Sequence, residues 1–455
     1  MRVLPAAFLM LLVACSPVAE TTRRAAPDLA LPPMNTFAQS TPTLPRVPNA
    51  VIARDFLDLV FRLENGDEVP VFSRFEGPVT VGVRGAAPAT LEGDLERLIG
   101  RLRREAGIDI RRAADGGPAS ITVEAIPRAS IQRFAPSAAC FVRPNVSSWD
   151  EYRARRSDPA TFWNRLTTRT RMAVFVPADV SPQEVRDCLH EEIAQALGPV
   201  NDLYRLTDSI FNDDNFHTVL TGYDMLILKA YHDPALESGM TRYEVASRLP
   251  SILARLNPRG GFQGIADPLP SSGAWSQAVI KATATGTARG RRTAYAEEAV
   301  TIARRDGGTD TELAFSYYLL GRLALANDPN VAFRAFEAAG RIYGSRPDTR
   351  IQAAHVALQM AAFQLSAGEA EEAIRLVDAN AGPIRDSQHA ALLSLMLMVK
   401  AEAMEVIGKA NEAGAVRTEA LAWARYGFGS EAEISDRMGE ILAISPRSRR
   451  EGRPA

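Results

Sequence analysis

A short stretch of the chain carries acidic, amide and histidine side chains at the spacing of a metal-dependent hydrolase helix. In such a helix two imidazoles four residues apart bind one zinc ion, and a glutamate directly after the first polarises the bound water. Here Glu191 and Gln195 stand at the two histidine positions, and Glu192 stands at the position of the general base. The spacing of a zinc site is therefore kept, but the imidazoles are absent.

His190 does not replace the missing ligands. Its partner four residues on is Ala194, which cannot bind a metal, and on a helix its side chain points about 100° away from that of Glu191. His217 and His232 do not stand at ligand spacing. We therefore predict neither a metal nor another cofactor.

Oxygen atoms remain available at the altered positions, and they leave two interpretations open. Glu191, Gln195 and Asn201 could hold a hard cation, or they could form a hydrogen-bonded polar patch. Glu192 is either a general base or a solvated helix residue. The polar run over 212–215 is either a weak calcium loop or a solvated loop.

The longer pattern resembles the metzincin family of zinc proteases over roughly residues 75–235. By this resemblance, Gly198 takes the place of the glycine at which metzincin chains bend, and Asn201 takes the place of the third zinc ligand. Ser209, Ile210 and Phe211 are similar to the Ser-Ile-Met turn that lies beneath the metal. The resemblance implies a zincin fold whose metal site has degenerated.

The same residues also resemble a bacterial family, the domain of unknown function number 2927. The resemblance rests on the pattern Glu-Glu-x-x-Gln-x-Leu-Gly-x-x-Asn-Asp over 191–202 and on a later Gly239-Met240. It covers about half of the chain and implies no assigned activity.

Composition excludes several other function classes. The 455 residues include 52 Lys and Arg against 54 Asp and Glu, so the basic excess typical of a nucleic-acid-binding protein is missing. No glycine-rich phosphate loop follows a strand, and no Gly-x-Ser-x-Gly elbow occurs. Nucleotide-dependent and serine-hydrolase chemistry are therefore not indicated.

The N-terminus has the pattern of an export signal. Residues 1–14 combine Arg2 with a short apolar run, and Leu-Val-Ala then precedes Cys15. This box resembles the signal at which bacterial lipoproteins are cut and lipidated, so we expect a membrane anchor on Cys15. Ser16 follows in place of aspartate, which in Gram-negative lipoproteins implies the outer membrane, facing the periplasm. Residues 15–46 are predicted to be the lipidated cysteine and a solvated Pro/Thr-rich tether.

Two cysteines remain once Cys15 is assigned to lipid. In an exported chain, an even remainder favours a disulfide between Cys140 and Cys188. Two buried free thiols are the alternative.

Two unlike domains are expected after the tether. Residues 47–265 mix strand and helix patterns, which predicts an α+β domain. Strands are predicted near 78–83, 120–123 and 172–176, and helices over 89–106 and from Pro182 to a left-handed stop at Gly198. A further helix is expected from Thr221, and the Arg-rich stretch 144–170 is predicted to lie on the surface.

Residues 273–444 are rich in alanine and helical throughout, and residues 445–455 are predicted to be a disordered tail. A repeat appears when Ala332, Ala373 and Ala413 are aligned, at spacings of 41 and 40 residues. It resembles tetratricopeptide-like helical hairpins, although the period is not 34. We therefore expect an all-α, solenoid-like domain; a non-repeating bundle is the alternative.

Two functions from different classes follow. The first is a non-enzymatic envelope protein that binds a protein or peptide partner, with a dead protease domain and a helical interaction domain. The second is a hydrolase in which Glu192 acts as general base at an unusual or non-zinc site.

Overall fold

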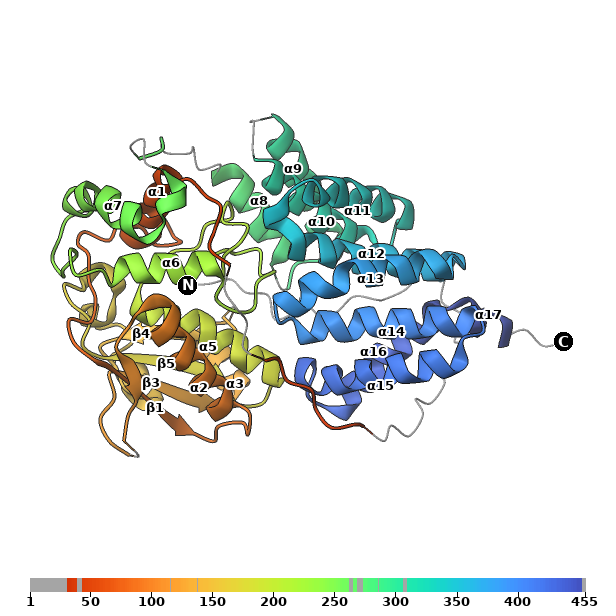
Figure 1. The fold of residues 1–455 in the computed structure, drawn as a ribbon, viewed down its shortest axis with the longest axis horizontal. Coiled ribbons are helices and arrows are strands. Elements are labelled where there is room, and N and C mark those ends of the chain that lie inside the picture. The colour runs from red at the N-terminus through yellow and green to blue at the C-terminus, as the bar shows by residue number, and fades with distance from the viewer. Residues whose placement is uncertain are drawn as a thin grey trace. The chain divides into compact units, whose positions relative to one another are not determined.

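A computed structural model of the chain describes residues 31–38, 43–114, 116–136, 138–261, 265–267, 273–284, 286–305 and 309–451. They form two compact units (Figure 1). The first unit contains the described residues between 43 and 267 apart from 181–183, and the second contains 31–38, 181–183 and 273–451. The predicted signal peptide and Cys15 lie outside the described residues. Among the described helices, none is both long and apolar enough to span a membrane.

A five-stranded sheet forms the centre of the first unit, in the order β2-β1-β3-β5-β4. The strands are β1 (Val79–Gly85), β2 (Ile110–Arg112), β3 (Ile121–Ile126), β4 (Phe141–Pro144) and β5 (Met172–Pro177). All neighbours run parallel except the edge strand β4, which is antiparallel to β5. The three predicted strands are confirmed as β1, β3 and β5. The two shorter strands were not predicted.

Helices cover both faces of this sheet because its side chains alternate between two apolar clusters. One cluster joins alternate residues of the strands, such as Val123 and Val174, to α2 (Leu91–Arg101), to the π-helical turn Leu102–Ala106, and to α5 (Pro182–Leu197). The predicted helices over 89–106 and from Pro182 are confirmed by these elements.

The opposite face is covered by α3 (Arg128–Phe134) and α4 (Trp149–Arg155). Phe175 of β5 packs there against Trp149 and Tyr152, with ring centroids 5.1 and 5.5 Å away. The stretch 144–170, predicted to lie on the surface, has many exposed residues, but its aromatic residues also build a second small core.

Three further α-helices complete the first unit: α1 (Asn49–Phe61), α6 (Gly222–Tyr231) and α7 (Arg242–Leu256). Helix α6 begins at the expected position with a capping box, in which Thr221 and Asp224 each accept a hydrogen bond from the other's backbone amide. Short 3-10 turns lie at Pro159–Thr161, Trp163–Arg165 and Pro258–Gly260.

The second unit is helical, as predicted. Its helices are α8 (Gly273–Thr283), α9 (Arg289–Arg305), α10 (Asp310–Ala324), α11 (Pro329–Gly344), α12 (Arg350–Ala367), α13 (Ala370–Asp386), α14 (Ala390–Val406), α15 (Ala410–Gly427), α16 (Glu431–Ile444) and α17 (Pro446–Glu451), with a 3-10 turn at Pro347–Thr349. Three successive pairs pack together: α10 with α11, α12 with α13, and α14 with α15. Ala332, Ala373 and Ala413 are each the fully buried fourth residue of the second helix in a pair. The sequence repeat therefore corresponds to equivalent positions in the fold.

Two segments of the second unit differ from the sequence-based expectation. Helix α17 occupies residues that were predicted as part of a disordered tail. Residues 31–38, predicted as part of a solvated tether, lie instead against α15.

Candidate functional site

Helix α5 carries Glu191, Glu192 and Gln195 of the hydrolase-like pattern, and Asn201 follows the helix. The Gln195 amide donates from Nε2 to Oδ2 of Asp202 at 3.5 Å. The Asn201 amide donates instead to the backbone carbonyl of Asp58 in α1, at 3.0 Å. Glu191 is half-buried. Two of the three degenerate ligand positions are thus used in separate hydrogen bonds within the fold.

Glu192, the candidate general base, is buried with only 1% of its surface exposed. The interpretation of this residue as a solvated helix position is therefore wrong. A general base must reach the water that it activates, and burial restricts that access for Glu192.

His190 is held inside the fold by the backbone. Its Nδ1 accepts a hydrogen bond of 3.1 Å from the amide of Leu220, so Nε2 carries the proton in the neutral ring. Burial, with added repulsion from Arg101 and Arg186, places its pKa well below the ordinary value. The ring is neutral at physiological pH, and the nitrogen facing Leu220 is occupied.

The other two histidines of this unit are also bound to backbone groups. His217 donates from Nε2 to the carbonyl oxygen of Thr207 at 2.9 Å, and His232 donates to that of Leu197 at 3.0 Å. Burial lowers the pKa of both rings, that of His232 to about 4. These three histidines contact three separate parts of the backbone, so the residues present do not fit a zinc site of the metzincin kind.

A buried arginine that was not among the predicted site residues holds the end of α5. The Arg169 guanidinium donates at 2.6–2.8 Å to three backbone carbonyls of the helix end: those of Gln195, Ala196 and Gly198. It also donates to the hydroxyl of Tyr231 at 2.9 Å. A cation at a helix C-terminus satisfies carbonyls that lack a partner within the helix and interacts favourably with the helix dipole. No motif pointed to Arg169 because it lies in a loop of the Arg-rich stretch.

Gly198 follows α5, but the predicted left-handed conformation is wrong: Gly198 is not among the glycines with positive φ. Its role is steric. A Cβ atom at this position would lie 2.9 Å from Cδ2 of Leu228 in α6. The glycine therefore permits close approach of the chain after α5 to α6.

The predicted turn at Ser209, Ile210 and Phe211 is tied to the start of α6. The Ser209 hydroxyl donates to Oδ1 of Asp224, and the amide of Ile210 donates to Oδ2 at 3.1 Å. The Phe211 ring is fully buried in the main core. Asp224 thus joins this turn to the capping box of α6.

One acidic group in the first unit has the chemistry of a hard-cation ligand set. Carboxylate oxygens of Glu64, Asp202 and Asp213 lie within 4.8 Å of one another. Burial and the nearby acids raise the pKa of Tyr204 well above its usual value. Oxygen donors of this kind suit calcium or magnesium better than zinc. Asp213 comes from the polar run singled out in the sequence, whereas Glu64 follows α1 and was not predicted.

The remaining polar run forms a structured loop. The Asn212 amide donates to the carbonyl of Leu206 at 2.9 Å and to the carboxylate of Asp214 at 2.8 Å. The amide of Asp214 in turn donates to Oδ1 of Asn212 at 3.0 Å. These bonds exclude the interpretation of 212–215 as a freely solvated loop.

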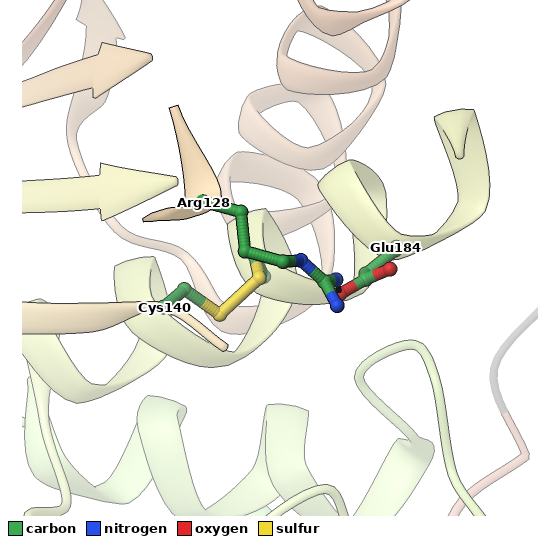
Figure 2. The surroundings of a disulfide bond; sticks show 4 residues. Arg128, Cys140 and Glu184 are labelled. Carbon is green, nitrogen blue, oxygen red and sulfur yellow. Dashed lines mark ion pairs between the residues drawn. A yellow bond between two sulfur atoms is a disulfide. The ribbon is translucent and has the colours of Figure 1, made fainter. Parts of the chain in front are cut away.

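The predicted disulfide is confirmed. Cys140, directly before β4, is bonded to Cys188 in α5, with their Cα atoms 5.9 Å apart. Figure 2 shows Cys140 near an ion pair between Arg128 of α3 and Glu184 of α5. The edge strand and the helix that carries the candidate site are therefore covalently joined.

Residues 49–251 match the model of a family described as "Protein of unknown function (DUF2927)". The match confirms the predicted resemblance to that family, and it includes the sheet, α5 and the Ser209 turn. Neither a curated protein nor a solved structure matches the chain.

Proposed function

We propose that this chain is an envelope lipoprotein that binds other molecules without catalysis. In this proposal the first unit is a metzincin-like domain that has lost its zinc site. The helical second unit, with tetratricopeptide-like pairs, supplies a protein-interaction surface, and a lipid on Cys15 anchors the chain to the outer membrane, facing the periplasm. The disulfide between Cys140 and Cys188 supports export to an oxidising compartment.

One observation carries the non-catalytic part of the proposal. The side chains at two former ligand positions, Gln195 and Asn201, are turned to hydrogen bonds within the fold. The same region retains the helix, the close approach at Gly198 and the turn at Ser209. A domain that has these elements but lacks zinc-binding side chains favours a binding function over hydrolysis.

The hydrolase alternative assigns the general-base role to Glu192. Its 1% exposure argues against this role, because the carboxylate would have to contact water or substrate. The carboxylates of Glu64, Asp202 and Asp213 would suit a hard cation, but a cation bound there would not restore zinc chemistry.

The test is to restore the missing imidazoles. The triple variant Glu191→His, Gln195→His and Asn201→His should bind one zinc ion per chain, measured by elemental analysis after gel filtration. Its matched control carries alanine at the same three positions and should bind none. A folded histidine variant without zinc would contradict the metzincin-like interpretation.

A second arm tests for catalysis directly. The unmodified chain should not cleave peptide or glycan substrates, and the isosteric variant Glu192→Gln should behave in the same way. Turnover by the unmodified chain that Glu192→Gln abolishes, with unchanged thermal unfolding, would replace this proposal with the hydrolase alternative.

A further inference from the structure

An uncharged segment from the N-terminal part of the chain lies on the helical unit. This N-terminal strap, residues 31–38, has the sequence Leu-Pro-Pro-Met-Asn-Thr-Phe-Ala and forms neither helix nor strand. The Phe37 ring stacks on Trp423 of α15, with centroids 4.4 Å apart and planes inclined by 26°. Trp423 is 9% exposed beneath it.

Polar contacts hold the strap on either side of this stack. The Arg425 guanidinium donates to the carbonyl of Pro32 at 2.8 Å, and the Gln388 amide donates to that of Ala38 at 3.1 Å. Between them, the amide of Asn35 donates to the carbonyl of Ala422 at 3.0 Å. Three of the four contacts use only backbone atoms of the strap. The Phe37 side chain is therefore the main feature of the strap sequence that these contacts recognise.

We infer that α15 carries a peptide-binding site, formed by Trp423, Arg425, the carbonyl of Ala422 and Gln388 before α14. Its ligand is an extended, uncharged peptide with an aromatic side chain five residues after a proline, and the strap fills the site in cis. A partner that presents such a segment binds by displacing the strap. The inference rests on the proposed interaction role of the helical unit and names its ligand chemistry.

Two physical features favour this ligand class. Stacked aromatic rings gain free energy beyond that of simple burial, and the stack of Phe37 on Trp423 also removes apolar surface from water. Prolines restrict the free peptide, which lowers the entropy lost on binding. Because the strap carries no charge, its binding depends little on ionic strength.

The test uses a fluorescent peptide of residues 29–40 and the chain from which residues 31–38 are deleted. Fluorescence anisotropy should give saturable binding of one peptide per chain. The undeleted chain should bind the same peptide at least tenfold more weakly, because its site is filled. Raising the salt concentration should change the affinity by less than about twofold.

Variants then assign the contacts. In the deletion background, Trp423→Ala and, separately, Arg425→Gln should each weaken binding, the first at least tenfold. Glu412→Gln, at the other end of α15, is the matched control and should leave binding unchanged. In the peptide, Phe37→Ala should abolish saturation, whereas Thr36→Ala, at an exposed position, should not.

Three results would overturn the inference. The first is a folded deletion variant that does not bind the peptide. The second is binding by the Trp423→Ala and Arg425→Gln variants that equals binding by the deletion variant without these substitutions. The third is a dimer of the full chain, formed by exchange of the strap and detected by its mass in light scattering. The zinc test concerns the first unit and the peptide test the second, so failure of one is distinguishable from failure of the other.

Discussion

The Arg169 guanidinium donates a hydrogen bond of 2.6 Å to the carbonyl oxygen of Gly198, one residue beyond the end of α5. The two residues are 29 positions apart in the chain. The end of the helix that carries the candidate site is therefore capped by a side chain that is distant in the chain.

Replacing this arginine should destabilise the first unit severely. Arg169→Met leaves several buried carbonyls without their donor, and each such group costs about 1–3 kcal/mol. We expect the free energy of unfolding to fall by at least about 3 kcal/mol, measured by urea denaturation. Arg165→Met, at an exposed position in the same segment, should change it by less than about 0.5 kcal/mol. Equal effects of the two substitutions would contradict the capping role.

The disulfide should contribute to stability independently of any activity. The double variant Cys140→Ala and Cys188→Ala should lose about 2–4 kcal/mol in the free energy of unfolding, because the unfolded chain is no longer cross-linked. Reductant should destabilise the unmodified chain to a similar extent and leave the double variant unchanged. If reductant destabilised the double variant as well, its effect could not be assigned to this bond.

The stability of the first unit should fall as pH decreases. The pKa of His232 is about 4 in the folded chain, below its ordinary value of 6.5. Between these values the unfolded state binds the proton more readily, so stability is lost as pH falls from 6.5 towards 4, by up to about 3 kcal/mol. His232→Gln keeps a donor for the carbonyl of Leu197 but does not titrate. Unfolding curves at pH 7 and pH 4.5 should differ less for this variant; an identical difference would exclude His232 as a source of the acid sensitivity.

The turn before α6 should depend on the Ser209 hydroxyl. Ser209→Ala removes a hydrogen bond to the buried carboxylate of Asp224 and should cost about 1.5–3 kcal/mol. The control Ser247→Ala removes a hydroxyl from an exposed position in α7 and should be nearly neutral. Thermal unfolding distinguishes the two. A neutral Ser209→Ala would mean that the backbone amides hold Asp224 without the hydroxyl.

Local patterns predicted those parts of the fold whose signal lies within a few residues. Strand β1 begins with alternating apolar residues, β3 and β5 are mainly apolar runs of six residues, and the cap at Thr221 and Asp224 spans a single turn. Strands β2 and β4 contain only three and four residues, too few for a periodic pattern. Their pairing with β1 and β5 depends on partners distant in the chain.

The candidate site was predictable in its residue types but not in its contacts. The spacing of Glu191 and Gln195 placed both correctly on α5. It could not indicate that Gln195 bonds to Asp202 or that Asn201 bonds to α1, because these contacts follow from the path of the chain after the helix. Gly198 illustrates the same limit. The sequence indicates that a glycine follows the helix, but the need for a glycine comes from the proximity of Leu228, which is distant in the chain.

The docking of residues 31–38 on the helical unit would also restrict that unit if the chain carries the lipid anchor that we propose. If Cys15 is the lipid-bearing residue, as we propose, only 16 residue steps separate the anchor from Leu31. At about 3.5 Å per residue, this segment could span at most roughly 55 Å. If the strap were released, the segment between the anchor and the helical unit would become longer, and the helical unit could reach further from the membrane. Displacement of the strap from α15 by a partner peptide would then also increase the distance from the membrane at which the helical unit can bind.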